Sequence, residues 1–558
     1  MYRRVSTLLV LGVSVVLAQQ PETRASLDPA RPARVGVGIT QRNLTLEEAV
    51  QMALENNLEI DIERTNRSTA ETNVQAARGF FDPNFRWTPL LQTTNTPTGS
   101  LLQGSSGKLT DRGFVNNFYF RQKLTNQGTS FNVDFENSRI STTNPFTSFT
   151  PWMSSRLLLG LSQPLLRGRT IDRQRAQLLI SQKQVNASNI DLEVRVIDIV
   201  TRVEQAYWDL VAARQAVSVT EDSVGWAREQ LALNQRLVKA GTLAPVELAA
   251  AEAELQRRMD TWYTSLGALT EVENNLKTLI APERVASIWN DEIIPVENRI
   301  AEPPQSDDLH NAVQVALKQR AELRGIQVRR DINDVQKNLN SDLQKPEVNF
   351  IGQYWLSGLG GTVSAVDNPF SAASIAQAQR LNEISTRLGL QPLPTNGMTG
   401  APPGFLVGSY GTALGNLFGG RYQSFQVGLS IDFNFRNRSA DANYSQTLIN
   451  EKRIGLEKAR AEQIIEAQVR NALQGIQTAR QRIAAAEASA RAAKEKLDSE
   501  QRLYQTGEST NFLVLTRQNE YADSRRREVV ARLDLNKSVS RLEQALGQTL
   551  NTHSIALK

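Results

Sequence analysis

The feature that most limits how this chain can fold is a very long stretch almost free of proline, and it occurs twice. In the range Pro164–Pro282 the only internal proline is Pro245, and no proline follows Pro403. Because an interior proline costs about 3 kcal/mol in a helix, both stretches predict long uninterrupted helices. We expect one helical hairpin at 170–279 and a second at 438–546.

Both predicted hairpins carry a narrow apolar stripe. Its residues recur at alternating steps of three and four, which is the seam of a coiled coil. A stripe this narrow cannot bury a globular core, so the helices are expected to pack side by side. The stripe comprises Val196, Val200, Val203, Tyr207, Leu210 and Val217 in the first hairpin, interrupted by Arg214, and Ile465, Val469, Ala472, Ile476, Ala479, Ile483 and Ala486 in the second.

Each hairpin is interrupted once, at a matching sequence. The segment 235–241 ends in Lys239-Ala240-Gly241, and the segment 501–507, 266 positions later, ends in Gln505-Thr506-Gly507. Glycine readily adopts the left-handed conformation that closes a helix, so each segment predicts a turn back. An ascending helix of roughly 70 residues would reach roughly 100 Å, far more than a compact domain needs.

The chain reads as two copies of one unit. A helix is expected from Leu44, with Thr45 as its cap and Glu48 completing a capping box, and its core at 49–54 reappears at 312–317. We therefore divide the chain into a first repeat at 44–281, a linker at 282–307, a second repeat at 308–550 and a C-terminal tail at 551–558.

The N-terminal residues resemble a secretory signal peptide. Arg3 and Arg4 precede an apolar run, and Val16-Leu17-Ala18 offers a cleavage site, which predicts removal of residues 1–18. The alternative, a membrane anchor, needs about 20 apolar residues, and this run is shorter. Residues 19–43 have no periodicity and are expected to form a flexible leader.

Between the opening helix and the long hairpin, both repeats change to strand-like sequence. The clearest example is 425–435, where apolar and polar residues alternate as in a transmembrane barrel strand. The first repeat has four such segments and the second has two. Long Gly-, Ser-, Thr- and Asn-rich joins at 93–113, 141–154 and 357–423 contrast with a short turn at 126–128, as in outer-membrane barrels. The alternative is a small soluble sheet.

In these features the chain resembles the TolC-like outer membrane efflux proteins. The resemblance depends on the opening segment 44–57, on 161–168 where a strand leads into the long helix, and on the duplicated hairpin tips. It implies a mixed α and β membrane protein, in which long coiled-coil hairpins form a periplasmic tunnel and a β-barrel is shared between the protomers of a homotrimer. The residues agree with this, because one chain supplies too few strands to close a barrel in lipid.

The resemblance also implies a function. The chain would be the outer-membrane channel of a tripartite efflux or type I secretion system, passively conducting solutes from a periplasmic adaptor and inner-membrane pump to the exterior. It would contact outer membrane lipid and no nucleic acid. The solute and the class of pump stay open, as does whether the resting channel is open or closed.

Site residues are carried over by position from the family's tips and periplasmic aperture. The tips, where the adaptor would bind, are Lys239, Ala240, Gly241 and Thr242, and Gln505, Thr506, Gly507 and Glu508. Glu247 and Tyr504 correspond to partners that latch the mouth. Ser509 replaces a basic latch residue, and Leu513 and Thr516 replace two aspartates, so we expect fewer salt bridges and no cation-binding ring in the aperture.

Two departures from the family pattern leave alternatives open. The additional hairpin, 114–124 with 129–140, would give a trimeric barrel of eighteen strands in place of twelve if it enters the membrane. The 357–423 insert is long enough to form an extracellular plug or lid, and 375–388 within it could be a short helix.

Two other functional classes fit the sequence less well. An enzyme has little support: the 558 residues include no cysteine and only two histidines, and neither His310 nor His553 has neighbours at metal-ligand spacing. We therefore expect no catalytic, cofactor or metal site. A non-conducting coiled-coil scaffold spanning the envelope fits the helices but leaves the strand segments unexplained. The 63 basic and 58 acidic residues are spread along helices and not clustered, so the charge says little about partners.

Overall fold

The computed structural model describes residues 34–38, 40–99, 107–297, 308–365, 369–393 and 402–556. The expected signal peptide and most of the leader lie outside these residues. The chain divides into two compact units. The helical unit comprises the described residues of 1–62, 193–320 and 464–558, and the sheet unit comprises those of 63–192 and 321–463.

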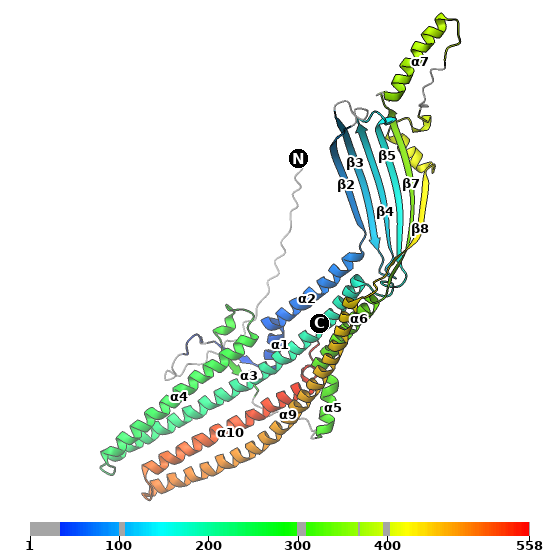
Figure 1. Ribbon diagram of the computed structural model, residues 1–558. Coiled ribbons are helices and arrows are strands. Elements are labelled where there is room, and N and C mark those ends of the chain that lie inside the picture. The colour runs from blue at the N-terminus through cyan, green and yellow to red at the C-terminus, as the bar shows by residue number, and fades with distance from the viewer. Residues whose placement is uncertain are drawn as a thin grey trace, which may run out of the picture. The chain divides into compact units, whose positions relative to one another are not determined.

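The long hairpins form as the proline pattern predicts (Figure 1). The first consists of α3 (Arg173–Lys239) and α4 (Pro245–Ile280), and the second of α9 (Arg438–Thr506) and α10 (Asn511–Leu546). The helices have 67 and 36 residues in the first hairpin and 69 and 36 in the second. Pro245 occupies the first turn of α4, where its missing N–H leaves no helical bond unmade.

The apolar stripes of the two hairpins contribute to the core of the helical unit. Val200, Val203 and Tyr207 of α3 and Val469 of α9 are completely buried, so the predicted seam is confirmed there. Arg214, which interrupts the stripe, keeps its charge paired: its Nη1 lies 3.1 Å from Glu292 Oε1 and donates to the Ile293 carbonyl at 2.9 Å.

Short elements complete the helical unit. Helix α1 (Leu46–Asn56) begins with the expected Thr45–Glu48 capping box, and α5 (Leu309–Gln319) opens the second repeat. The first residues of α2 (Leu58–Arg78) also belong here, as do η2 (Ser287–Trp289) and α11 (Thr549–Thr552).

The described end of the leader and the described start of the linker pair with each other. Strand β1 (Gln41–Leu44) pairs in parallel with β6 (Glu292–Pro295), which joins the end of the expected flexible leader to the expected linker. The bonds lie between residues about 250 positions apart, and so the local sequence does not reveal them.

The sheet unit is built on one antiparallel sheet (Figure 1). Its order is β2-β3-β4-β5-β7-β8, so neighbouring strands follow each other along the chain. The unit also contains η1 (Gly79–Phe81), α6 (Ala321–Leu343), α7 (Pro369–Arg387), η3 (Gly404–Leu406) and α8 (Tyr410–Phe418). The strands are β2 (Asn84–Pro97), β3 (Lys108–Lys123), β4 (Ser130–Thr142), β5 (Phe149–Pro164), β7 (Glu347–Val363) and β8 (Gln423–Asp432).

Two expectations about the strands are refined by the sheet. Strands β2 to β5 and β7 extend further than their sequence patterns indicated, so the loops are shorter, with 98–107 in place of the expected 93–113. Strand β8 instead ends at Asp432, before the end of the expected segment 425–435. The additional hairpin, left open above, pairs within the same sheet as β3 and β4, between β2 and β5. The short helix expected at 375–388 is present as part of α7.

Among the described residues, no helix combines the length and the apolar character needed to cross a bilayer.

Candidate functional site

The two tip turns adopt the same geometry. Gly241 and Gly507 have φ of 77° and 84°, the left-handed conformation that glycine adopts without strain. In each turn an amide reaches back five residues: Thr242 N donates to Leu237 O at 3.0 Å and Glu508 N to Leu503 O at 2.8 Å. This is the Schellman closure of a helix C-terminus. All eight predicted tip residues are exposed.

The helix starts after the two turns differ. Thr510 caps α10, and its side chain accepts a hydrogen bond from the Leu513 amide. Ala244, at the same place before α4, offers no side-chain cap. The two tips therefore share their closing turn but differ in how the returning helix begins.

Glu247 and Tyr504, predicted as latch partners, belong to one hydrogen-bond network in which other side chains connect them. Glu247 Oε2 accepts from Asn511 Nδ2 at 3.2 Å, and Tyr504 Oη donates to Asn234 Oδ1 at 3.4 Å. Gln230 connects the two halves, since its Nε2 lies 3.0 Å from Asn234 Oδ1 and 2.9 Å from Asn511 Oδ1. Burial raises the pKa of Tyr504; a hydrogen bond with Gln230 opposes this shift and the Glu247 charge adds to it.

The three amide side chains of this network were not predicted from the sequence. Gln230, Asn234 and Asn511 are buried, and a buried amide needs partners for its donors and acceptors. Polar residues among helix positions that face a neighbour are a weak signal in sequence, because the same residues also occur on solvated faces. Here they connect α3 to the start of α10.

The other predicted aperture residues lie near the same tip. The hydroxyl of Ser509 contacts Glu500, whose other oxygen lies 3.7 Å from Arg517 Nε. Leu513 is exposed, and the Thr516 hydroxyl donates to Phe512 O of its own helix at 2.8 Å. A basic side chain is thus close to the Ser509 position, but it comes from Arg517.

A buried arginine holds the hairpins together further from the tips. Arg258 of α4 donates to Ser223 O of α3 at 3.0 Å and to Gln518 Oε1 of α10 at 3.1 Å. Its Nε also lies 2.8 Å from Glu254 Oε1. Burial alone raises the pKa of Glu254, but hydrogen bonds from Arg257, Arg258 and Asn519 outweigh burial and lower the pKa to about 2.

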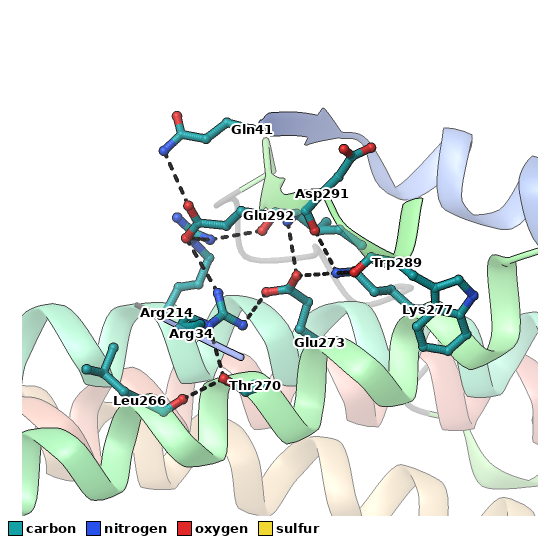
Figure 2. A network of polar contacts seen from close by, with 11 residues as sticks. Arg34, Gln41, Arg214, Leu266, Thr270, Glu273, Lys277, Trp289, Asp291 and Glu292 are labelled. Atoms are coloured by element: carbon teal, nitrogen blue, oxygen red, sulfur yellow. Dashed lines mark hydrogen bonds and ion pairs between the residues drawn. The ribbon is translucent and has the colours of Figure 1, made fainter. Parts of the chain in front are cut away.

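A second charged network fastens the β1–β6 pair to the hairpin of α3 and α4. Figure 2 shows Glu273 between Arg34 and Lys277, with ion-pair distances of 2.6 and 2.8 Å. Lys277 Nζ also donates to the carbonyls of Trp289 and Asp291 at 3.1 and 2.6 Å. Because Glu273 and Lys277 are fully buried, each charge depends on these partners.

The sheet has two chemically different faces. Residues directly opposite each other on neighbouring strands share a face, so one row across the strands identifies each side. The apolar face carries the row Phe85, Phe120, Val133, Leu159, Tyr354 and Phe425. The polar face carries the adjacent row Asn84, Arg121, Asn132, Gly160, Gln353 and Gln426.

Helix α8 of the 357–423 insert packs on the apolar face. A Cβ on Gly358 would lie 2.0 Å from Ala413 O, and one on Gly360 would lie 2.9 Å from Ala413 N, so only glycine allows this approach. Gly358 lies opposite Ser155, which α8 helps to bury completely. This part of the insert therefore does not cover the polar face, as a plug in a lumen would.

The comparison with protein families gives one match. The sequence profile described as outer membrane efflux protein matches residues 49–281 and 364–548, which is more than half of the chain. No match is found among curated protein sequences.

Several solved structures share the fold over 90% of this chain. The CmeC outer membrane channel of Campylobacter jejuni has a TM-score of 0.60 at 14% identity, with 86% of that chain covered. The outer membrane protein VceC of Vibrio cholerae has 0.57 at 13%, with 96% covered. The open state of the MtrE outer membrane channel of Neisseria gonorrhoeae has 0.55 at 16%, with 89% covered.

Proposed function

Because this chain belongs to the outer membrane efflux protein family, we propose that it is the outer-membrane exit duct of a tripartite efflux or type I secretion system. Solutes would pass through it from a periplasmic adaptor and an inner-membrane pump to the exterior. The chain performs no chemistry in this process. It supplies a wetted lumen and a mouth that opens when the adaptor engages the tips.

The observation that carries this proposal is the two-faced sheet with unpaired edges. In the described sheet, β2 and β8 each have one neighbour, and an unpaired strand edge in lipid leaves backbone groups unsatisfied at several kcal/mol each. Three copies joined edge to edge satisfy both edges. The apolar face then meets lipid and the polar face lines the lumen.

Six strands from each of three chains make a barrel of eighteen strands. The pairing of β3 with β2 and of β4 with β5 supports this number over twelve. Barrel diameter grows roughly linearly with strand number, so the eighteen-strand lumen is about one and a half times as wide as a twelve-strand one.

The channel itself is tested with the full-length protein extracted in detergent. We expect a trimer by native mass spectrometry, heat-modifiable migration on gels, and ion conductance in planar bilayers. A monomer without conductance would contradict the proposal and favour the non-conducting scaffold.

The strand number has its own test. Since the chain has no cysteine, Gln426→Cys on the polar face provides one spin-label site per protomer. Distances between labels in the trimer should match the wider barrel, and distances expected for twelve strands would contradict the eighteen-strand arrangement.

The tips are proposed as the adaptor contact. Their exposure and their shared closing turn support this role. Thr242→Cys and Glu508→Cys should form crosslinks to a periplasmic adaptor in cells, whereas Glu495→Cys, exposed on α9, should not. Equal crosslinking at all three positions would contradict the assignment.

The aperture is proposed to be held by the Glu247–Asn511–Gln230–Asn234–Tyr504 network. Breaking it by Glu247→Ala or Tyr504→Phe should raise single-channel conductance, whereas Glu495→Ala should not. No difference among the three variants would mean that these residues do not latch the mouth.

A further inference from the structure

Three side chains with metal-binding atoms meet in the helical unit, away from the tips. Glu204 lies in α3, Glu543 near the end of α10, and His553 directly after α11. One ligand atom from each lies within 4.8 Å of the other two. From the sequence, we expected His553 to be structural or incidental, because it has no neighbours at metal-ligand spacing. The fold supplies one from 349 positions away.

The cluster holds more acidic than basic groups. Two carboxyl groups accompany one imidazole, whose Nε2 contacts Glu204 Oε1. The Glu204 side chain is 3% exposed, and its second oxygen, Oε2, is buried without a hydrogen-bond partner among the described residues. A buried carboxylate oxygen without a donor is unfavourable. A bound cation would satisfy it.

The donor set restricts which cation fits. Magnesium and calcium are usually held by oxygen ligands alone. An imidazole nitrogen with two carboxylate oxygens is a ligand set typical of zinc, which commonly takes three protein ligands and leaves a fourth position for water.

We propose that Glu204, Glu543 and His553 bind one divalent metal ion of the zinc class, and that this ion holds the C-terminal segment against α3 and α10. The nearby Tyr207 stabilises the same part of α3. Its hydroxyl donates a hydrogen bond to Leu44 O at 3.0 Å and so connects α3 to β1. The site lies within one chain and does not depend on the channel function proposed above.

The first test measures bound metal. Full-length protein purified without a histidine tag is stripped with EDTA, dialysed against zinc, and analysed by mass spectrometry for metal content. We expect one zinc ion per chain. Glu543→Gln and His553→Ala should each weaken binding at least about tenfold. His310→Ala removes the only other histidine of the chain and should leave binding unchanged.

A second readout needs no variant. X-ray absorption of the zinc-loaded wild type should show one imidazole nitrogen among oxygen ligands, and zinc should raise its thermal midpoint more than that of Glu543→Gln. Equal zinc binding by wild type, Glu543→Gln and His553→Ala would overturn the proposal. So would the absence of retained zinc, which would leave the cluster as an ion pair with one further carboxyl group.

Discussion

The helical unit buries charged side chains, whereas the sheet unit exposes apolar ones. Glu273 and Lys277 are fully buried, and each has its partners within the same unit. On β8 of the sheet unit, Phe425 is 79% exposed, and Val427, Leu429 and Ile431 are exposed beside it.

The difference shows which interactions a single chain completes. In the helical unit, hydrogen bonds and ion pairs within the same unit stabilise the buried charges of Glu273 and Lys277. The apolar face of the sheet is covered by α8 near Gly358 but remains open along β8. An exposed apolar surface of this extent indicates a contact beyond the chain, which in our proposal is lipid.

The largest effect is expected when a buried charged side chain of the helical unit is removed. Glu273→Ala removes one partner of Lys277 and Arg34, and a buried ion pair that loses one member costs about 3–5 kcal/mol. Urea unfolding followed by circular dichroism measures the loss. The control, Arg482→Ala, breaks a more exposed pair with Asp534 and should cost less than about 1 kcal/mol. Similar losses in both variants would remove the contrast between buried and exposed pairs.

The next largest effect is expected when a charge is placed on the apolar face of the sheet and not on its polar face. Leu429→Arg places a charge on the apolar face and should destabilise the membrane-inserted protein by about 2–4 kcal/mol. Gln426→Arg, on the same strand but on the polar face, should change it little. Folding yield into lipid vesicles compares the two, and equal yields would mean that the apolar face does not meet lipid.

The hydrogen bonds that Glu254 accepts from Arg257, Arg258 and Asn519 make the stability of the helical unit depend on pH. Glu254→Gln removes hydrogen bonds to a charged group and should cost about 1.5–3 kcal/mol at pH 7. The folded pKa, about 2, lies below the ordinary 4.5, so this contribution is present above pH 4.5 and is lost as the pH falls towards 2.

The difference in thermal midpoint between wild type and Glu254→Gln should therefore shrink on acidification over this range. Glu495→Gln, an exposed position on α9, provides the matched control and should show no such trend. A difference in thermal midpoint that stayed constant with pH would show that the stabilising contribution of Glu254 does not depend on its charge.

The smallest effect concerns the exposed tips of the helical unit. Thr510→Ala removes the α10 cap and should cost about 1 kcal/mol locally, while Ala244→Thr should add a cap to α4 and stabilise it by a similar amount. Hydrogen exchange of the first amides of each helix measures both changes. Global unfolding caused by either variant would contradict the view that the tips are locally stabilised.

Much of the helical unit was predictable because its signals are local. Proline spacing and the seam of three and four located both hairpins, and Gly241 and Gly507 located their turns. The strand segments were recognised from alternation, but their ends were not, since the polar residues at 98–107 and 143–148 resemble those within the strands. The position of the additional hairpin within the sheet could be determined only from the observed strand pairing.

What the sequence by itself determined is therefore the set of elements, their duplication and the apolar side of each, because these follow from periodicity and backbone preference along a short stretch. Only the tertiary structure decided which distant groups meet. Arg34 with Glu273, Gln230 with Asn511, and Glu204 with His553 are each separated by more than 200 positions. The physical reason is that a buried polar atom needs a partner in space, and sequence spacing carries no information about which distant residue will supply it.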